Sequence, residues 1–222
     1  MLNRILIAFF SVLLGALLIG TRFELSWAGG NGFVESVPAG VLSVDGAGTV
    51  DHGGKQRPLV ENDALVRGEI IKTEGGGRVI IKIGTAVSVA LDERTDVLLE
   101  DLRPGSITLK LIQGRFLLDT HARAESAHPA ITIATAHTKT SVKTGQLSMV
   151  NYSFRDTVSV IPIDALAAVV VGDKKGFLTK TPVDIHETDP ITTTDFVFDP
   201  TTGAAKDFYA WAARAKKSDE RF

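Results

Sequence analysis

Apolar and polar side chains alternate along much of the central part of the chain. From Val79 to Ile83 the odd positions are apolar and are separated by Ile80 and Lys82. The same period of two recurs in segments 87–91, 107–111, 131–133 and 158–160. A period of two places one set of side chains on one face of a β-strand. These segments therefore predict short strands, each with one face toward a core.

Turn-forming residues separate these segments at short intervals. They are Asp45-Gly46, Gly53-Gly54, Gly75 to Gly77, Arg103-Pro104-Gly105, Gly114 and Gly145. No amphipathic helical pattern lies between the predicted strands, which disfavours a parallel sheet built from β-α-β units. We therefore predict a mainly β fold, an antiparallel two-sheet sandwich that is jelly-roll-like or a β-roll, with a short C-terminal helix.

The C-terminal segment has a different pattern. Residues 189–206 are rich in Thr, Asp and Pro and predict a loop with room for one short strand. Residues 207–222 predict a helix, since Phe208 and Trp211 begin an apolar series at helical spacing that continues through Ala212 and Ala215. We expect this helix to dock on the β body through Phe208 and Trp211; binding to a separate partner is the alternative.

The N-terminal segment indicates export. Arg4 is followed by an apolar run over residues 5–20, which is shorter than the roughly 20 residues of a membrane span. Ser26-Trp27-Ala28 supplies a small-x-small cleavage site, so residues 1–28 predict a signal peptide cleaved after Ala28. A retained signal anchor, with residues 5–20 in the inner membrane, is the alternative. Residues 29–39 predict a flexible leader to a periplasmic or secreted domain.

Composition narrows the function classes. The 222 residues carry a net charge of −2, and aromatic residues are only 7% of the chain. Neither value favours nucleic-acid binding, which needs a positive field and bases stacked on aromatic side chains. The chain has no cysteine, which excludes disulfides, thiolate metal sites and a cysteine nucleophile.

Three consecutive glycines, Gly75 to Gly77, admit two interpretations. Glycines that cradle a phosphate lead into a helix, whose free N–H groups meet the anion. Here they lead into the strand pattern that starts at Arg78, and no Lys-Ser or Lys-Thr follows. We therefore predict a hairpin turn, in which glycine supplies the positive φ.

Residues 65–91, LVRGEIIKTEGGGRVIIKIGTAVSVAL, resemble the opening of the FecR domain, the periplasmic domain of the ferric-citrate regulator family. Segments 107–119 and 131–145 resemble its later strands, and the resemblance covers residues 40–188. The positions that carry it are Gly68, Glu69, Thr73, Gly75, Gly76, Gly77, Arg78, Gly84, Thr85, Gly114 and Gly145. The chain departs from the family at Glu69, where Asp is usual, at Ile83, and at Lys143-Thr144-Gly145 in place of Arg-Gly-Thr.

No residue is marked as catalytic, cofactor-binding or metal-ligating by its context. The histidines His52, His121, His128, His137 and His186 form no HxH or HExxH pair. Residues 92–96, DERTD, lack the EF-hand pattern; they predict a polar hairpin end in which Arg94 screens the acids, or a contact with a polar ligand. No GxSxG elbow surrounds Ser141, Ser148, Ser153 or Ser159.

We therefore expect a non-catalytic exported module that recognises a protein or envelope component through strand edges and loops. The resemblance implies sensing across the envelope. Direct control of a sigma factor is not expected, because about four residues precede the apolar run. One alternative is a carbohydrate- or peptidoglycan-binding module, for which Trp211, Tyr152 and Tyr209 are the available aromatic side chains. A second alternative is an unrecognised periplasmic hydrolase.

Overall fold

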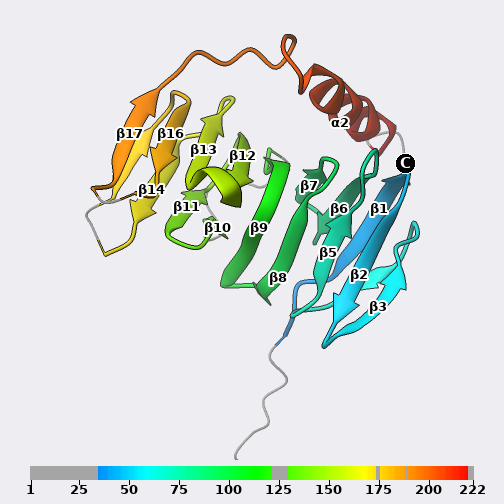
Figure 1. Ribbon diagram of the computed structural model, residues 1–222. Helices are drawn as coiled ribbons and strands as arrows, with labels where there is room; N and C mark the ends of the chain where they lie inside the picture. Colours follow the sequence, from blue (N-terminus) through cyan, green and yellow to red (C-terminus); the bar gives the residue numbers. More distant parts are fainter. Residues whose placement is uncertain (1–34, 122–129, 174–175, 189, 220–222) are drawn as a thin grey trace, which may run out of the picture. The chain divides into compact units, whose positions relative to one another are not determined.

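The computed structural model describes residues 35–121, 130–173, 176–188 and 190–219 (Figure 1). The predicted signal peptide and most of the predicted leader lie outside the described residues. From Ser36 onward the chain forms one compact unit. In the part of the chain that the structure describes, no helix is both long and apolar enough to cross a bilayer.

Seventeen strands and one C-terminal helix make up the regular structure of the described residues, with one 3₁₀ turn at Ser153–Arg155. The strands are β1 (Ala39–Asp45), β2 (Gly48–His52), β3 (Lys55–Pro58), β4 (Ala64–Leu65), β5 (Ile70–Thr73), β6 (Arg78–Ile83), β7 (Val87–Leu91), β8 (Asp96–Arg103), β9 (Ser106–Asp119), β10 (Ile131–Ala134), β11 (Thr138–Val142), β12 (Gln146–Tyr152), β13 (Thr157–Pro162), β14 (Ala167–Val171), β15 (Phe177–Thr179), β16 (Val183–His186) and β17 (Thr192–Asp195). The helix is α2 (Lys206–Asp219).

These strands form two sheets, which share strand β9. Sheet A has the strand order β4-β1-β6-β7-β9-β12-β13-β16-β17. Sheet B has the order β3-β2-β5-β8-β9-β10-β11-β14-β15. Among the described strands every pairing is antiparallel except β9 with β10, which is parallel. The predicted fold class, mainly β with antiparallel sheets and a short C-terminal helix, is confirmed.

Strand β9 passes from one sheet to the other. Its first half pairs with β8 and β10 in sheet B, and its second half pairs with β7 and β12 in sheet A. Gly114 lies at the change of sheet with φ +94°. The core-facing positions shift there from odd, as at Leu111, to even, as at Phe116. The sequence predicted that Gly114 would separate two strands, whereas it bends a single one.

The core lies between the two sheets and contains the side chains predicted by the alternation. Val79, Ile81 and Ile83 are at most 1% exposed. One cluster joins inward side chains of both sheets, from Val41 in β1 to Ile185 in β16. This continuity gives the two sheets one shared core, in which each sheet buries its apolar face against the other.

Helix α2 covers part of the outer face of sheet A. Phe208, Tyr209 and Ala212 pack against the outward side chains of Ile80, Ala90 and Leu117 in strands β6, β7 and β9. Residues 196–205 lead from β17, at the edge of sheet A, to this helix (Figure 1). The helix therefore completes a second, smaller apolar cluster.

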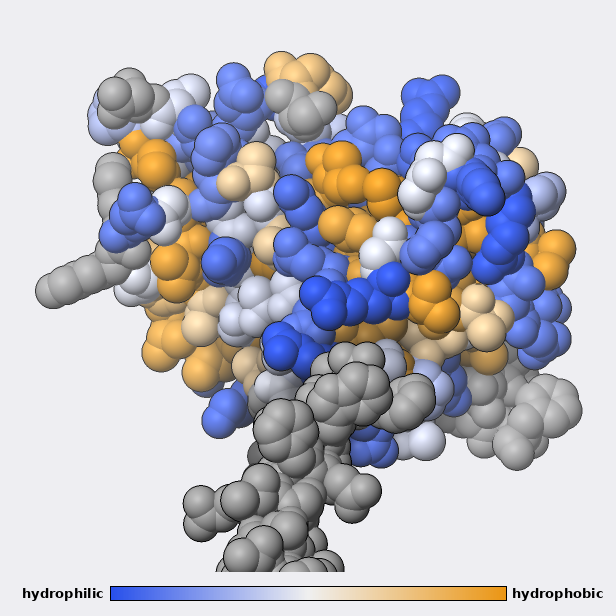
Figure 2. Space-filling model, turned by 90° about the horizontal axis from the view of Figure 1, so that it is seen from below, coloured by the Kyte–Doolittle hydropathy of each residue, from blue (hydrophilic) through white to orange (hydrophobic). Residues whose placement is uncertain are grey.

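On the described residues, exposed apolar side chains are scattered over the surface. Large exposed apolar side chains occur in several separate segments, among them Val60, Leu166 and Val197. The face shown in Figure 2 likewise has hydrophilic and hydrophobic residues interspersed. Single exposed apolar residues of this kind are ordinary on a folded surface and do not mark an interface.

Candidate functional site

The two ends of the sheets differ in how their edge strands are protected. At one end, the edge of sheet A is β4, which has two residues, and the edge of sheet B is β3, whose sequence is Lys-Gln-Arg-Pro. Very short strands, charged side chains and proline are the usual devices that prevent a sheet edge from pairing with another chain. Strands β3 and β4 are therefore poor templates for strand addition.

The opposite end carries β15 in sheet B and β17 in sheet A. Strand β15 is Phe-Leu-Thr, with Leu178 67% exposed, and β17 is Thr-Thr-Thr-Asp with every residue exposed. Neither strand contains a proline or a lysine. Among the described strands, β17 forms a ladder with β16 alone. Its outward backbone groups are available to a further strand.

The hydrogen-bond pattern shows which groups of β17 point outward. The Phe196 N–H donates to the Pro182 carbonyl at 3.2 Å, and Thr194 lies opposite Asp184 in the same ladder. Partners in an antiparallel ladder alternate, so Thr192 and Thr194 bond to β16. Thr193 and Asp195 therefore direct their N–H and C=O groups away from β16.

The glycine turn is a turn, as the sequence predicted, but it does not form a hairpin. It joins β5 of sheet B to β6 of sheet A, and these two strands do not pair with each other. Gly76 has φ +76° and donates its N–H to the Glu93 carboxylate at 2.7 Å. A Cβ at Gly77 would collide with the Ala47 carbonyl, so this glycine is needed for a close approach of two backbones.

A cleft of about 600 Å³ lies beside this turn. We call it the arginine cleft; its lining residues are Arg78, Asp92, Glu93, Arg94, Gln113, Gly114, Arg115, Asn151, Tyr152, Phe154 and Ala204. The DERTD segment, which the sequence placed at a hairpin end, instead links β7 of sheet A to β8 of sheet B and contributes three of these residues.

Asp92 holds two arginines of the cleft. Its carboxylate accepts hydrogen bonds from Arg78 Nε at 3.3 Å and from Arg115 Nη1 at 3.0 Å. Arg115 Nη2 also lies 3.4 Å from the Tyr152 hydroxyl. In contrast, Arg94 has no hydrogen bond or ion pair to any described residue, apart from those of its backbone. Among the described residues, the Arg94 guanidinium is therefore the one in the cleft that has no carboxylate partner.

Two buried threonines fix the backbone under the cleft. The Thr73 hydroxyl donates to the Asp92 carbonyl and accepts the Thr95 N–H at 2.8 Å. The Thr95 hydroxyl in turn accepts the Arg115 N–H at 3.0 Å. These bonds tie the ends of β5 and β7 to the middle of β9, next to Gly114, and they account for a threonine at 73, one of the positions of the family resemblance.

Aromatic side chains line one side of the cleft. Tyr152 and Phe154 have ring centroids 5.6 Å apart, and Phe154 is 76% exposed. The other aromatics expected to be available for sugar stacking are less accessible: Tyr209 is buried, and Trp211 is half-buried against Phe208 and beneath the Arg78 guanidinium, 5.9 Å from the ring centroid.

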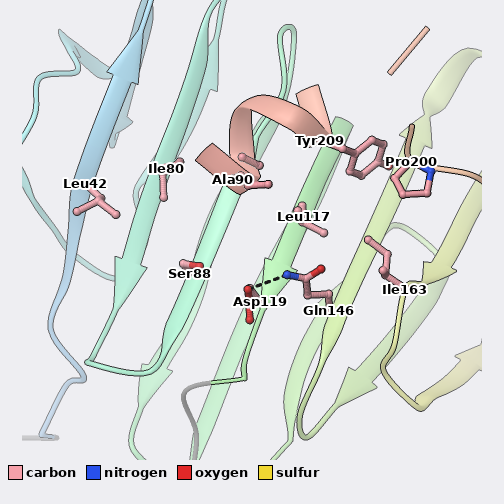
Figure 3. Close-up of a pocket in the computed structure, with 12 residues that line it drawn as sticks. Leu42, Ile80, Ser88, Ala90, Leu117, Asp119, Gln146, Ile163, Pro200 and Tyr209 are labelled. Atoms are coloured by element: carbon pink, nitrogen blue, oxygen red, sulfur yellow. Dashed lines mark hydrogen bonds between the residues drawn. The ribbon is translucent and has the colours of Figure 1, made fainter. Parts of the chain in front are cut away.

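A smaller cavity of about 190 Å³ lies between α2 and sheet A (Figure 3). Its walls are mostly apolar, including Leu42, Ile80 and Leu117, and the Asp119–Gln146 hydrogen bond of 2.9 Å closes one end. Small-molecule sites generally occupy about 300–1,000 Å³. The arginine cleft falls within this range and the cavity under the helix falls below it.

The remaining positions of the family resemblance lie in other turns. The Glu69 carboxylate accepts the Val66 N–H at 2.8 Å beside Gly68, and Gly84 donates its N–H to Pro38, with the exposed Thr85 next to it. Gly145 accepts a hydrogen bond from Thr120. Of the resemblance positions, Arg78 and Gly114 line the arginine cleft. Gly76 contacts its lining residue Glu93, and Trp211 of the helix lies against Arg78.

The histidines and serines that the structure describes do not come together in one site. His121 lies between Asp119 and Asp164, at 3.0 Å and 2.8 Å, while His128 lies outside the described residues. In the described ranges, no group of three or more metal-ligating side chains could hold an ion. Ser141, Ser148 and Ser159 bond to Thr132, Phe116 and Asp184 respectively, with Tyr209 a further partner of Ser148, and not to any described histidine.

Comparisons with known proteins give fold-level likeness only. No protein-family model matches the sequence, and no curated protein matches it. Two crystal structures of a "putative anti-sigma factor" from Parabacteroides distasonis are similar to the chain at 12% identity, with TM-scores of 0.49 and 0.48. The matches cover 64% and 57% of this chain, and the chain spans 64% and 59% of the length of those structures.

Proposed function

We propose that this protein is a non-catalytic recognition module that binds an extended segment of a protein partner at strand β17. The observation that carries the proposal is the asymmetry of the edge strands: β3 is charged and ends in proline and β4 has only two residues, whereas β17 contains neither proline nor lysine. An added strand gains backbone hydrogen bonds along the edge, which is a common route of peptide recognition.

The proposed location is outside the cytoplasm. The support is the N-terminal sequence, in which Arg4 precedes an apolar run and Ser26-Trp27-Ala28 follows it. With the resemblance of residues 40–188 to the FecR domain, this supports a role in signalling within the envelope. The partner is then an envelope protein that presents a strand.

The experiment uses the absence of cysteine from the chain. A Thr194→Cys variant places one thiol on β17, and a Gln56→Cys variant places one on the protected edge strand β3. Each full-length variant is expressed in its native cells and treated with a thiol-directed photocrosslinker. We expect a defined adduct, identified by mass spectrometry, from Thr194→Cys and not from Gln56→Cys.

The decisive variant adds Thr193→Pro to Thr194→Cys. Thr193 directs its N–H away from β16, so proline should leave the existing ladder intact while removing one outward donor. Thermal denaturation should therefore change little, and the adduct should disappear. An adduct that survives Thr193→Pro, or one that forms equally from β3, would show that β17 does not bind the partner by strand addition.

A further inference from the structure

The arginine cleft has features of a ligand site that recognition at β17 does not explain. Its volume of about 600 Å³ lies within the range of small-molecule sites. It combines three guanidinium groups with two exposed aromatic rings, a combination that suits a molecule with a charged end and a flat end.

The charges of the cleft favour an anion. Both carboxylates already have partners: Asp92 bonds to Arg78 and Arg115, and Glu93 accepts the Gly76 N–H at 2.7 Å. Arg94 has no side-chain partner among the described residues, and its side chain passes over Gly75, where a Cβ would lie 3.7 Å from Nε. The unneutralised charge in the cleft is therefore positive.

Arg115 is held in place for such a contact. Asp92 fixes one end of its guanidinium group and the Tyr152 hydroxyl lies near the other, while the Arg115 N–H is anchored to Thr95. Its Nε is buried and has no hydrogen-bond partner among the described residues. Because Nε is shielded from solvent, the accessible donors to a ligand are on Nη2 of Arg115 and on Arg94.

We propose that the arginine cleft binds a small organic anion, in which a carboxylate or phosphate attached to a ring contacts Arg94 and Arg115 while the ring packs on Tyr152 and Phe154. A guanidinium fork matches the planar geometry of a carboxylate and also suits phosphate. The exposed ring of Phe154, 5.6 Å from that of Tyr152, supplies the apolar surface.

Isothermal titration of the full chain tests the charge requirement. The probes are benzoate, phenyl phosphate, inorganic phosphate and the neutral benzamide. We expect benzoate or phenyl phosphate to bind at least about tenfold more tightly than benzamide, since a hydrogen bond to a charged group contributes more than a neutral one. Whichever of benzoate and phenyl phosphate binds more tightly shows whether the cleft prefers a carboxylate or a phosphate. Equal binding of benzamide, or no heat with any probe, would overturn the proposal.

Variants locate the site. Arg94→Gln should weaken binding of the preferred anion by roughly tenfold, because one charge-assisted hydrogen bond is lost. Arg67→Gln is the matched control: Arg67 is an exposed arginine in the turn before β5, outside the cleft. Phe154→Ala should weaken ring-bearing anions and leave inorganic phosphate unaffected. Equal losses from Arg94→Gln and Arg67→Gln would show non-specific charge attraction instead.

Discussion

At the scale of single residues, the burial of Tyr209 in helix α2 makes the stability of the fold depend on pH. Burial raises the pKa of its phenol above 10.0, while the hydrogen bond to Ser148 works in the opposite direction. Because the raised pKa belongs to the folded state, the neutral phenol stabilises the fold below the unfolded pKa. That contribution is lost as the pH rises through the folded pKa.

The raised pKa of Tyr209 predicts how the stability of the fold changes at high pH. The free energy of unfolding should be level between about pH 8 and pH 9.5 and should decrease above about pH 10, the ordinary range of tyrosine ionisation. Urea denaturation at a series of pH values measures it. Tyr209→Phe removes the ionisable group, so its stability should fall less steeply above pH 10. Parallel curves for both proteins would show that Tyr209 does not couple ionisation to unfolding.

At the scale of the element, helix α2 is held by a small cluster in which Phe208 is the most buried side chain, at 1% exposed. Phe208→Ala should therefore undock the helix and lower the free energy of unfolding by about 3 kcal/mol. Limited proteolysis measures undocking, because trypsin should then cut after Lys206 and Arg214 at a higher rate. Phe154→Ala, at an exposed ring, is the control and should leave this rate unchanged. Equal rates for Phe208→Ala and wild type would contradict docking through Phe208.

The elements were predictable from local periodicity, but their partners were not. Alternation in residues 79–91 correctly predicted two strands, and helical spacing from Phe208 predicted α2. The hairpin expected at Gly75 to Gly77 was wrong, because local glycine content does not specify which sheet the next strand enters. A cue did exist in Ile80 and Ala90: apolar side chains on the outer face of a strand need a cover.

The arginine cleft was even less accessible from the sequence. Arg115 and Asp92 meet only because β7 and β9 pair in sheet A, and neighbouring residues reveal nothing of that pairing. The segment DERTD was recognised as polar and as able to face a ligand. Its two arginine partners and the exposed Tyr152 come from strands β6, β9 and β12. Long-range pairing, and not residue type, creates the site.

At the scale of the whole molecule, β9 is the strand through which both sheets share one core. Gly114, with φ +94°, allows its bend, and a Cβ there would come within 2.7 Å of the Arg94 carbonyl and collide with Thr95. Gly114→Ala therefore introduces backbone strain and overpacking together, each costing roughly 1–3 kcal/mol. Because both halves of β9 belong to the same core, the damage should not stay in one sheet.

We expect Gly114→Ala to lower the free energy of unfolding by at least about 2 kcal/mol in a single transition that both sheets share. Hydrogen exchange followed by mass spectrometry reports on each sheet separately. Peptides from β12 in sheet A and from β11 in sheet B should lose protection to the same extent. Gly105→Ala is the matched control, because a Cβ there meets no atom within 4 Å and its φ is not positive. Loss of protection confined to one sheet would show that the sheets unfold separately and that β9 joins them without coupling them.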